Sequence, residues 1–270
     1  MKSKLFVNRI RHVFYRFVWP KKFLIADADK YGLKFKFSIR DGIGTDIYYK
    51  WGVYSEDYIT QYILNEIGIN DGDLILDIGA NIGWYSLVLS YKAKPQVFAF
   101  EPEPNNFRLL SENVEMNHKD NIKVVNAAVD NKEGVMQLHL YKDYNQGRHS
   151  FIKHEKSKVT VDVQTIVLDK FLRENNVSEK RIKFLKIDIE GYEFTALRGA
   201  SHALSLTDHV LSEFSPGIME QINEEPMKYV EYMNGFGFKA FEMSPAGLHP
   251  ADFNKLIQHK EGVYNILWKR

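Results

Sequence analysis

The sequence contains no cysteine, no long hydrophobic run and almost no net charge. Without cysteine there is no disulfide, no thiolate metal site and no cysteine nucleophile. No apolar stretch approaches the roughly 20 residues that cross a bilayer. Arg9, Arg11 and Arg16 interrupt the N-terminal segment, which has no signal-peptide cleavage pattern, so we expect a cytoplasmic protein. The 36 basic and 35 acidic side chains nearly cancel, so we expect no nucleic-acid partner.

The first residues differ from the rest in charge. Residues 1–22 hold seven Lys or Arg and no acid. Their apolar residues follow helical spacing and predict an amphipathic helix: Phe6, Ile10, Val13, Phe14, Phe17 and Val18. Such a helix suits peripheral contact with an anionic membrane face, or it packs on its own domain or a partner subunit. Residues 33–50 predict a hairpin turning at 41–44, and we expect 1–50 to be an N-terminal extension of a domain over 51–270.

After Asp73 apolar strands alternate with helical stretches. A helix is expected from Ser55 to about Ile67, and further helices over Asn105–Met116 and 225–234. This alternation predicts an α/β fold: a Rossmann-like, mainly parallel sheet with helices on both faces. An additional hairpin-like stretch is expected at 134–166. The expected strands cover 74–77, 96–101, 122–129, 184–189, 209–214, 238–243 and 264–269.

A glycine-containing loop follows the first of these strands. The stretch from Asp77 to Gly83 reads Asp-Ile-Gly-Ala-Asn-Ile-Gly, and a helix is expected to begin at about Trp84. Gly79 and Gly83 allow a tight turn and the close approach of a ligand. The loop lies where open α/β sheets bind ligands, at the carboxyl ends of the strands and beside a helix N-terminus.

Two further strand ends complete a nucleoside-binding pattern. Glu101 ends the next strand, where an acid can accept hydrogen bonds from both ribose hydroxyls. Asn126, Ala127 and Ala128 end the third strand, where an adenine ring would pack. The loop lacks the middle glycine that lets a backbone touch a pyrophosphate. S-adenosylmethionine (SAM), which has no phosphate, therefore fits this loop better than a dinucleotide, and Asp77 can reach its amino-acid part or a bound water.

Several stretches resemble the FkbM-type methyltransferases, a class I SAM-dependent family. The resemblance covers roughly residues 50–270 and is most specific in FLKIDIEGYEFTALRGA. It implies O-methylation of sugars, glycans or polyketides, with SAM as cofactor. The other matching stretches are YSEDYI, LILDIGANIGWYSL, VFAFEPEPNNFRLLSENVEMN, VVNAAVDNKEG and VLSEFSP. The cofactor site is expected to comprise Asp77, Gly79, Ala80, Asn81, Gly83, Tyr85, Ser86, Glu101, Asn126, Ala127 and Asp188.

Candidate catalytic residues follow the fourth strand. Asp188 and Glu190, two positions apart, would share one face and open toward the methyl donor. Two close carboxylates raise one pKa, which suits a base acting on an alcohol. Alternatively, Glu190 caps the next helix and Asp188 only holds the SAM amino group. A divalent metal is not favoured, because two acids alone make a weak site.

His149, in an insertion that resembles the family's stretch beside the acceptor, is another candidate base. The alternative for it is an exposed loop histidine. Aromatic and polar residues crowd this insertion, which favours a sugar or glycan acceptor, lipid-linked or free. Methylation of a small metabolite such as a polyketide, and a non-catalytic SAM-binding partner protein, are the alternative functions.

Overall fold

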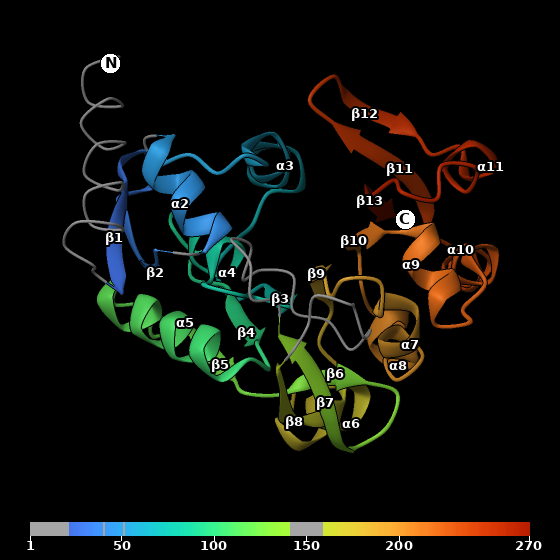
Figure 1. The fold of residues 1–270 in the computed structure, drawn as a ribbon, viewed down its shortest axis with the longest axis horizontal. Helices are drawn as coiled ribbons and strands as arrows, with labels where there is room; N and C mark the ends of the chain where they lie inside the picture. Colours follow the sequence, from blue (N-terminus) through green and yellow to red (C-terminus); the bar gives the residue numbers. More distant parts are fainter. Residues whose placement is uncertain (1–21, 40, 51, 141–158) are drawn as a thin grey trace.

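The computed structural model describes residues 22–39, 41–50, 52–140 and 159–270, and its centre is an eight-stranded sheet (Figure 1). The strand order is β12-β11-β13-β10-β9-β3-β4-β5. The strands from β10 to β5 run parallel, whereas β13, β11 and β12 are antiparallel. The expected α/β, mainly parallel architecture is therefore confirmed. The bounds are β3 Leu74–Ile78, β4 Gln96–Phe100, β5 Ile122–Val125, β9 Ile182–Ile187, β10 His209–Phe214, β11 Lys239–Ser244, β12 Gly247–Pro250 and β13 Tyr264–Lys269.

Both faces of this sheet are covered, because its strands are apolar on both sides. In β3, Ile75 belongs to one apolar cluster, whereas Leu74 and Leu76 belong to the other. Side chains alternate along a strand, so a continuous apolar run fills two cores. The first cluster includes α2 Gly42–Tyr49, α3 Asp57–Tyr62, the π-turn Ile63–Ile67, α4 Trp84–Val88 and α5 Pro104–Met116. The second includes α6 Leu168–Glu174, α7 Glu193–Leu197, α8 Ser201–Ser205, α9 Pro216–Gln221, α10 Pro226–Gly235 and α11 Phe253–Leu256.

The third expected strand, 122–129, is divided between two sheets. Its first part is β5, and its last residues belong to β6 Ala128–Asp130 in a separate sheet of order β6-β8-β7. The other strands of that sheet are β7 Gly134–Leu140 and β8 Val159–Val167, which pair antiparallel as the hairpin-like pattern predicted. Asn126 lies at the break and donates from Nδ2 to the carbonyls of Glu101 and Pro102. The break leads the chain past the carboxyl end of β4.

The hairpin expected over 33–50 is wrong. Strand β2 Leu33–Ser38 pairs with the preceding strand, β1 Phe23–Ala28, across a short 3₁₀ turn at Asp29–Tyr31. Residues 42–49 form helix α2, because Asp41 caps its N-terminus by accepting from the Gly44 amide at 2.5 Å. A Cβ at Gly44 would overlap Phe37, so the helix packs closely on β2. The Asp-Gly pair marks a helix start, not a turn between strands.

The hairpin β1–β2 packs on the domain at its α4 and α5 helices. Asn113 of α5 accepts from the Lys36 amide at 2.6 Å and donates to the Lys36 carbonyl at 3.0 Å. Asn117, one turn later, makes the same pair of bonds with Lys34. The ring of Phe35 lies 5.3 Å from that of Trp84 in α4. The predicted N-terminal helix, 1–22, lies outside the described residues, and no helix among those described is long and apolar enough to span a membrane.

Candidate active site

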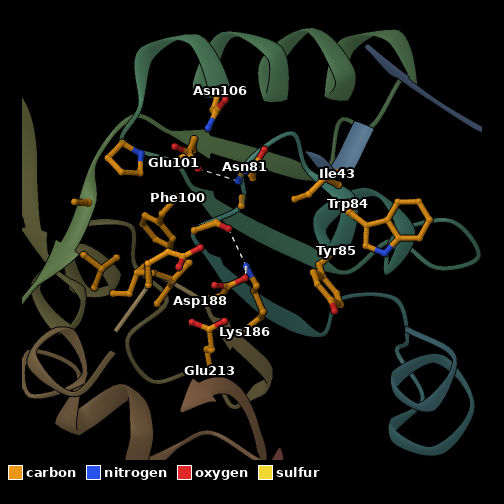
Figure 2. Close-up of a pocket in the computed structure, with 18 of the residues that line it drawn as sticks. Ile43, Asn81, Trp84, Tyr85, Phe100, Glu101, Asn106, Lys186, Asp188 and Glu213 are labelled. Atoms are coloured by element: carbon orange, nitrogen blue, oxygen red, sulfur yellow. Dashed lines mark hydrogen bonds and ion pairs between the residues drawn. The ribbon is translucent and has the colours of Figure 1, made fainter. Parts of the chain in front are cut away.

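A pocket lies at the carboxyl ends of strands β3, β4, β9 and β10 (Figure 2). Glu101 and Asn81 lie at one end of it, and Lys186, Asp188 and Glu213 lie at the other. We call these the β4 end and the acidic end. The lining residues are Ile43, Tyr54, Glu56, Ile78, Gly79, Ala80, Asn81, Trp84, Tyr85, Phe100, Glu101, Pro102, Asn106, Ala127, Ala128, Val129, Leu138, Lys186, Asp188, Ile189, Glu190 and Glu213.

The glycine-containing loop is held tightly between two strand ends. The amides of Gly79 and Ala80 both donate to the carbonyl of Phe100, at 3.0 and 2.9 Å. Gly79 has φ +76°, and a Cβ there would overlap the carbonyl oxygen of Asp188. Both conditions require glycine. Asn81 has φ +51°, and its buried Oδ1 has no hydrogen-bond partner among the described residues. The loop thus presents an unsatisfied polar atom at the β4 end of the pocket.

Glu101 is only 5% exposed and is fixed by the backbone. Its two carboxylate oxygens accept from the amides of Asn81, at 2.8 Å, and Glu103, at 2.9 Å. An ionised carboxylate can accept about four hydrogen bonds, so each oxygen keeps acceptor capacity for a ligand. Burial is the main cause that raises the pKa of Glu101 to about 7, against the two amide bonds, which lower it.

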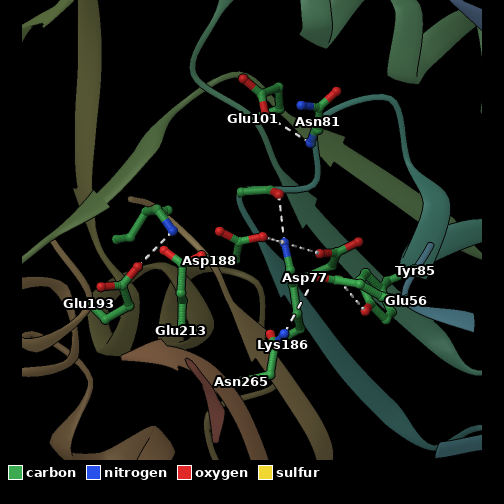
Figure 3. Close-up of polar contacts among 12 residues, drawn as sticks. Glu56, Asp77, Asn81, Tyr85, Glu101, Lys186, Asp188, Glu193, Glu213 and Asn265 are labelled. Atoms are coloured by element: carbon green, nitrogen blue, oxygen red, sulfur yellow. Dashed lines mark hydrogen bonds and ion pairs between the residues drawn. The ribbon is translucent and has the colours of Figure 1, made fainter. Parts of the chain in front are cut away.

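Lys186 connects the glycine-containing loop with the acidic end (Figure 3). Its Nζ donates to the Gly79 carbonyl at 2.8 Å and lies 3.3 Å from Asp188 Oδ2 and 3.8 Å from Asp77 Oδ1. Burial lowers the pKa of Lys186, but Asp188 and Asp77 outweigh it and the net direction is upward. The ammonium therefore stays charged, with the Gly79 carbonyl and Asp188 within hydrogen-bond distance and Asp77 as a longer ion-pair partner.

Four carboxylates surround the acidic end: Glu56, Asp188, Glu190 and Glu213. Glu56 accepts from Tyr85 Oη at 3.2 Å and Asn265 Nδ2 at 3.4 Å. Burial, and then the negative charge of Asp188, raise the pKa values of both Glu56 and Glu213. Asp188 is the more open member, because its side chain is 44% exposed.

A buried glutamate just beyond the pocket shapes the loop after β9. Glu193 Oε1 accepts from the amides of Ile189, at 2.8 Å, and Gly191, at 3.3 Å. Between them Glu190 adopts φ +58°, a left-handed conformation that a non-glycine residue rarely holds without support. Burial is the main cause that raises the pKa of Glu193 to about 7. Glu193 thus fixes the backbone that presents Asp188 and Glu190.

The structure brings most of the predicted site residues together. The pocket is lined by Gly79, Ala80, Asn81, Tyr85, Glu101, Ala127, Asp188 and Glu190. Four others do not line it: Asp77, Gly83, Ser86 and Asn126. Asp77 accepts from the amide and hydroxyl of Ser86, at 3.0 and 2.6 Å, so it fastens the first turn of α4. Gly83 makes room for Leu110 of α5. His149 lies outside the described residues.

Lys186, Glu56 and Glu213 are pocket residues that the sequence patterns did not assign. Lys186 and Glu213 each place a charge in a mostly buried strand, within FLKIDI and HVLSEF. A charge in a buried strand needs a partner or a ligand, so a charged residue at such a position indicates that Lys186 and Glu213 belong to a site. Glu56 reads only as part of a helix start, and nothing in its local sequence reveals that it reaches across to Asn265.

The residues that line the pocket fit SAM. Glu101 has free acceptor capacity for ribose hydroxyls, and the unpaired Oδ1 of Asn81 needs a donor. The apolar residues Ala127 and Leu138 line the same pocket and offer surface for a planar base. Within the described part of the chain, no three His, Asp or Glu side chains gather as a metal-binding group.

Comparison with known proteins defines the class and then the family. The methyltransferase domain of METTL16 superposes with a TM-score of 0.51 at 15% identity, covering 97% of this chain and 79% of that one. This shows the fold of class I SAM-dependent methyltransferases. A family model described as the methyltransferase FkbM domain matches residues 77–240, more than half of the sequence. The chain belongs to the FkbM methyltransferase family.

Two curated relatives show how far the similarity extends. The hexuronic acid methyltransferase AglP of Haloferax volcanii is 26% identical over 163 residues, which are 60% of this chain and 64% of that protein. The methyltransferase sdnD of Sordaria araneosa is 27% identical over 202 residues, covering 63% of this chain and 77% of that protein. The match thus spans somewhat less than two thirds of AglP.

Proposed function

We propose that the protein transfers the methyl group of SAM to a hydroxyl oxygen of a sugar or glycan. The observation that carries this proposal is the half-exposed carboxylate of Asp188, a residue whose backbone carbonyl packs against Gly79 of the glycine-containing loop. An alcohol must lose its proton when its oxygen is methylated, and a carboxylate within reach can accept it. The sugar acceptor is further supported by the relative AglP, whose name states hexuronic acid.

In this proposal the β4 end binds the nucleoside. Glu101 accepts from the two ribose hydroxyls, Asn81 Oδ1 accepts from a cofactor donor, and Ala127 and Leu138 pack on the adenine. Asp77, Ser86 and Gly83 support this half by holding the loop and α4 in place. Asn126 supports it by fixing the chain after β5.

The acidic end orients the acceptor and removes its proton. SAM supplies an electrophilic methyl group on a sulfonium. Asp188 accepts the hydroxyl proton, while Lys186 at 3.3 Å keeps that carboxylate oriented. Much of the rate enhancement comes from holding the acceptor oxygen in line with the methyl group, and Glu190 and Glu213 are placed to accept from the acceptor's other hydroxyls. His149 remains a second candidate base.

The test is methyl transfer by Asp188→Asn, with Asp162→Asn as control because Asp162 is an exposed residue of β8. We expect turnover to fall at least a hundredfold, roughly the scale of general-base catalysis, with SAM affinity nearly unchanged. Asp162→Asn should match the parent protein. Full activity of Asp188→Asn would remove Asp188 from the reaction, and activity abolished by EDTA and restored by Mg²⁺ would favour metal chemistry over a base.

The acceptor class is tested with labelled SAM and three substrate pools: nucleotide sugars, lipid-linked glycans and free metabolites. We expect label in a sugar-containing pool. Label in the metabolite pool alone would replace the glycan by a small secondary metabolite, and no label in any pool, with SAM bound, would favour a non-catalytic SAM-binding protein. Mass spectrometry of glycans from cells with and without the protein should show a difference of one methyl group.

A further inference from the structure

The acidic end of the pocket has a charge that restricts the acceptor. We propose, on the basis of the proposed function, that this enzyme accepts an uncharged or amino sugar and rejects a uronate or a phosphorylated sugar. Five carboxylates line the pocket, at Glu56, Glu101, Asp188, Glu190 and Glu213, whereas Lys186 is the single Lys, Arg or His among the described lining residues.

That single cation is already paired with groups of the protein. Lys186 Nζ donates to the Gly79 carbonyl at 2.8 Å, lies 3.3 Å from Asp188 Oδ2 and forms a longer ion pair with Asp77 Oδ1 at 3.8 Å. Its side chain is only 6% exposed. A carboxylate on the acceptor would therefore compete with Asp188 and Asp77 for Lys186, and it would meet Glu56 and Glu213 with no other protein cation among the described lining residues. Burying an uncompensated anion is costly.

The raised pKa values of two lining acids also indicate that an acidic acceptor is disfavoured. Burial and the neighbouring negative charge of Asp188 already raise the pKa values of Glu56 and Glu213. A further anion would add to this repulsion, whereas an ammonium would relieve it. Carboxylates are also good acceptors for sugar hydroxyls, so the hydroxyls of an uncharged sugar can donate to Glu190 and Glu213 without any new cation.

The relative AglP acts, by its name, on a hexuronic acid. At 26% identity the charge of that substrate does not transfer to this chain, because single side chains in the acceptor half decide it. The two proteins would then share the sugar acceptor but differ in the sign of charge that they tolerate.

The experiment uses three matched probes: p-nitrophenyl β-D-glucoside, β-D-glucosaminide and β-D-glucuronide, each with labelled SAM. We expect kcat/KM for the glucuronide to be at least tenfold below that for the glucoside, and the glucosaminide to equal or exceed the glucoside. Glu213→Gln should reduce the difference in kcat/KM between the glucoside and the glucuronide. Glu231→Gln, which alters an exposed acid of α10 outside the pocket, should leave it unchanged.

A glucuronide used as well as the glucoside would overturn the charge inference and leave the sugar methyltransferase standing. To separate the two further, binding of free glucose and free glucuronate to the protein loaded with S-adenosylhomocysteine is measured by saturation-transfer NMR. Glucose binding without glucuronate binding supports the inference even where turnover is slow. Equal binding of both overturns it, and label in none of the three probes together with binding of neither sugar overturns the proposed sugar acceptor itself.

Discussion

Replacing Glu101 by Gln tests the cofactor half of the site. The carboxylate accepts one backbone amide on each oxygen and has capacity for two ribose hydroxyls. In Glu101→Gln one of those oxygens becomes an NH2 group, which faces a backbone donor and cannot accept from ribose. A hydrogen bond to a charged group contributes about 1.5–3 kcal/mol. SAM affinity should therefore fall roughly tenfold to a hundredfold.

The pKa of Glu101 adds a pH signature to this prediction. Burial raises that pKa to about 7, so the acceptor form is lost as the pH falls below about 7. SAM binding by the parent protein should weaken between about pH 8 and pH 6, whereas Glu101→Gln should lack this component. Isothermal titration calorimetry across that range measures both effects.

Glu103→Gln is the matched control. Glu103 is also buried, but it caps α5 by accepting from the Asn106 amide at 2.7 Å and does not line the pocket. The Glu103→Gln variant should have a lower melting temperature because its helix cap is weakened, but its SAM affinity should be unchanged. If Glu101→Gln binds SAM as the parent does, or if both variants lose affinity equally, Glu101 does not hold the ribose.

Three further predictions concern the loop, pH and the N-terminus. Gly79→Ala should weaken SAM binding by more than tenfold in calorimetry, because its Cβ would overlap the Asp188 carbonyl. Gly32 has a similar φ but open space around it, so Gly32→Ala should cost only about 1 kcal/mol of stability in urea unfolding. Burial raises the pKa of Glu193 to about 7 and that of Asp41 to about 6, above the values of about 4 that such groups have in an unfolded chain. The ligand-free protein should therefore lose stability as the pH rises from about 4 to about 7, and Glu193→Gln should reduce that slope. A rise in stability over this range would contradict the prediction. Deleting residues 1–22 should abolish co-sedimentation with anionic liposomes if that segment binds membranes, and equal pelleting would exclude this role.

The sheet could be predicted from the sequence because its strands are simple apolar runs between helical patterns. β3, β4, β9 and β10 lie where the runs predicted them, to within two residues. The error at 33–50 arose because Asp-Gly is both a hairpin signal and a helix start. The side chain of Asp41 stabilises the helix start through its hydrogen bond from the Gly44 amide. The packing of Gly44 against Phe37 is a tertiary contact that local sequence does not reveal.

The residues at the β4 end of the pocket were predictable for the same reason: they lie at the ends of consecutive strands. The acidic end is assembled from distant segments. Glu56 precedes α3, Glu213 ends β10, and Asn265 in β13 bonds to Glu56 across 209 positions of the chain. No local pattern brings these residues together, and only the sheet order, with β10 and β13 adjacent, does so. Sequence reasoning therefore located the side chains at the β4 end of the pocket but missed most of those at the acidic end.

The stretch LKIDIEGYE is more specific than the glycine-containing loop for a physical reason. Within a few residues it supplies a cation between two aspartates at Lys186, a half-exposed carboxylate at Asp188, and a left-handed turn at Glu190 and Gly191. It must also supply its own buried clamp, Glu193, two residues after that turn. A tight loop after a strand needs only glycine, and many proteins share that need. In this segment four neighbouring charged residues each make different contacts, so far fewer sequences are compatible with it. A match to this stretch is therefore more informative about the family than a match to the glycine-containing loop.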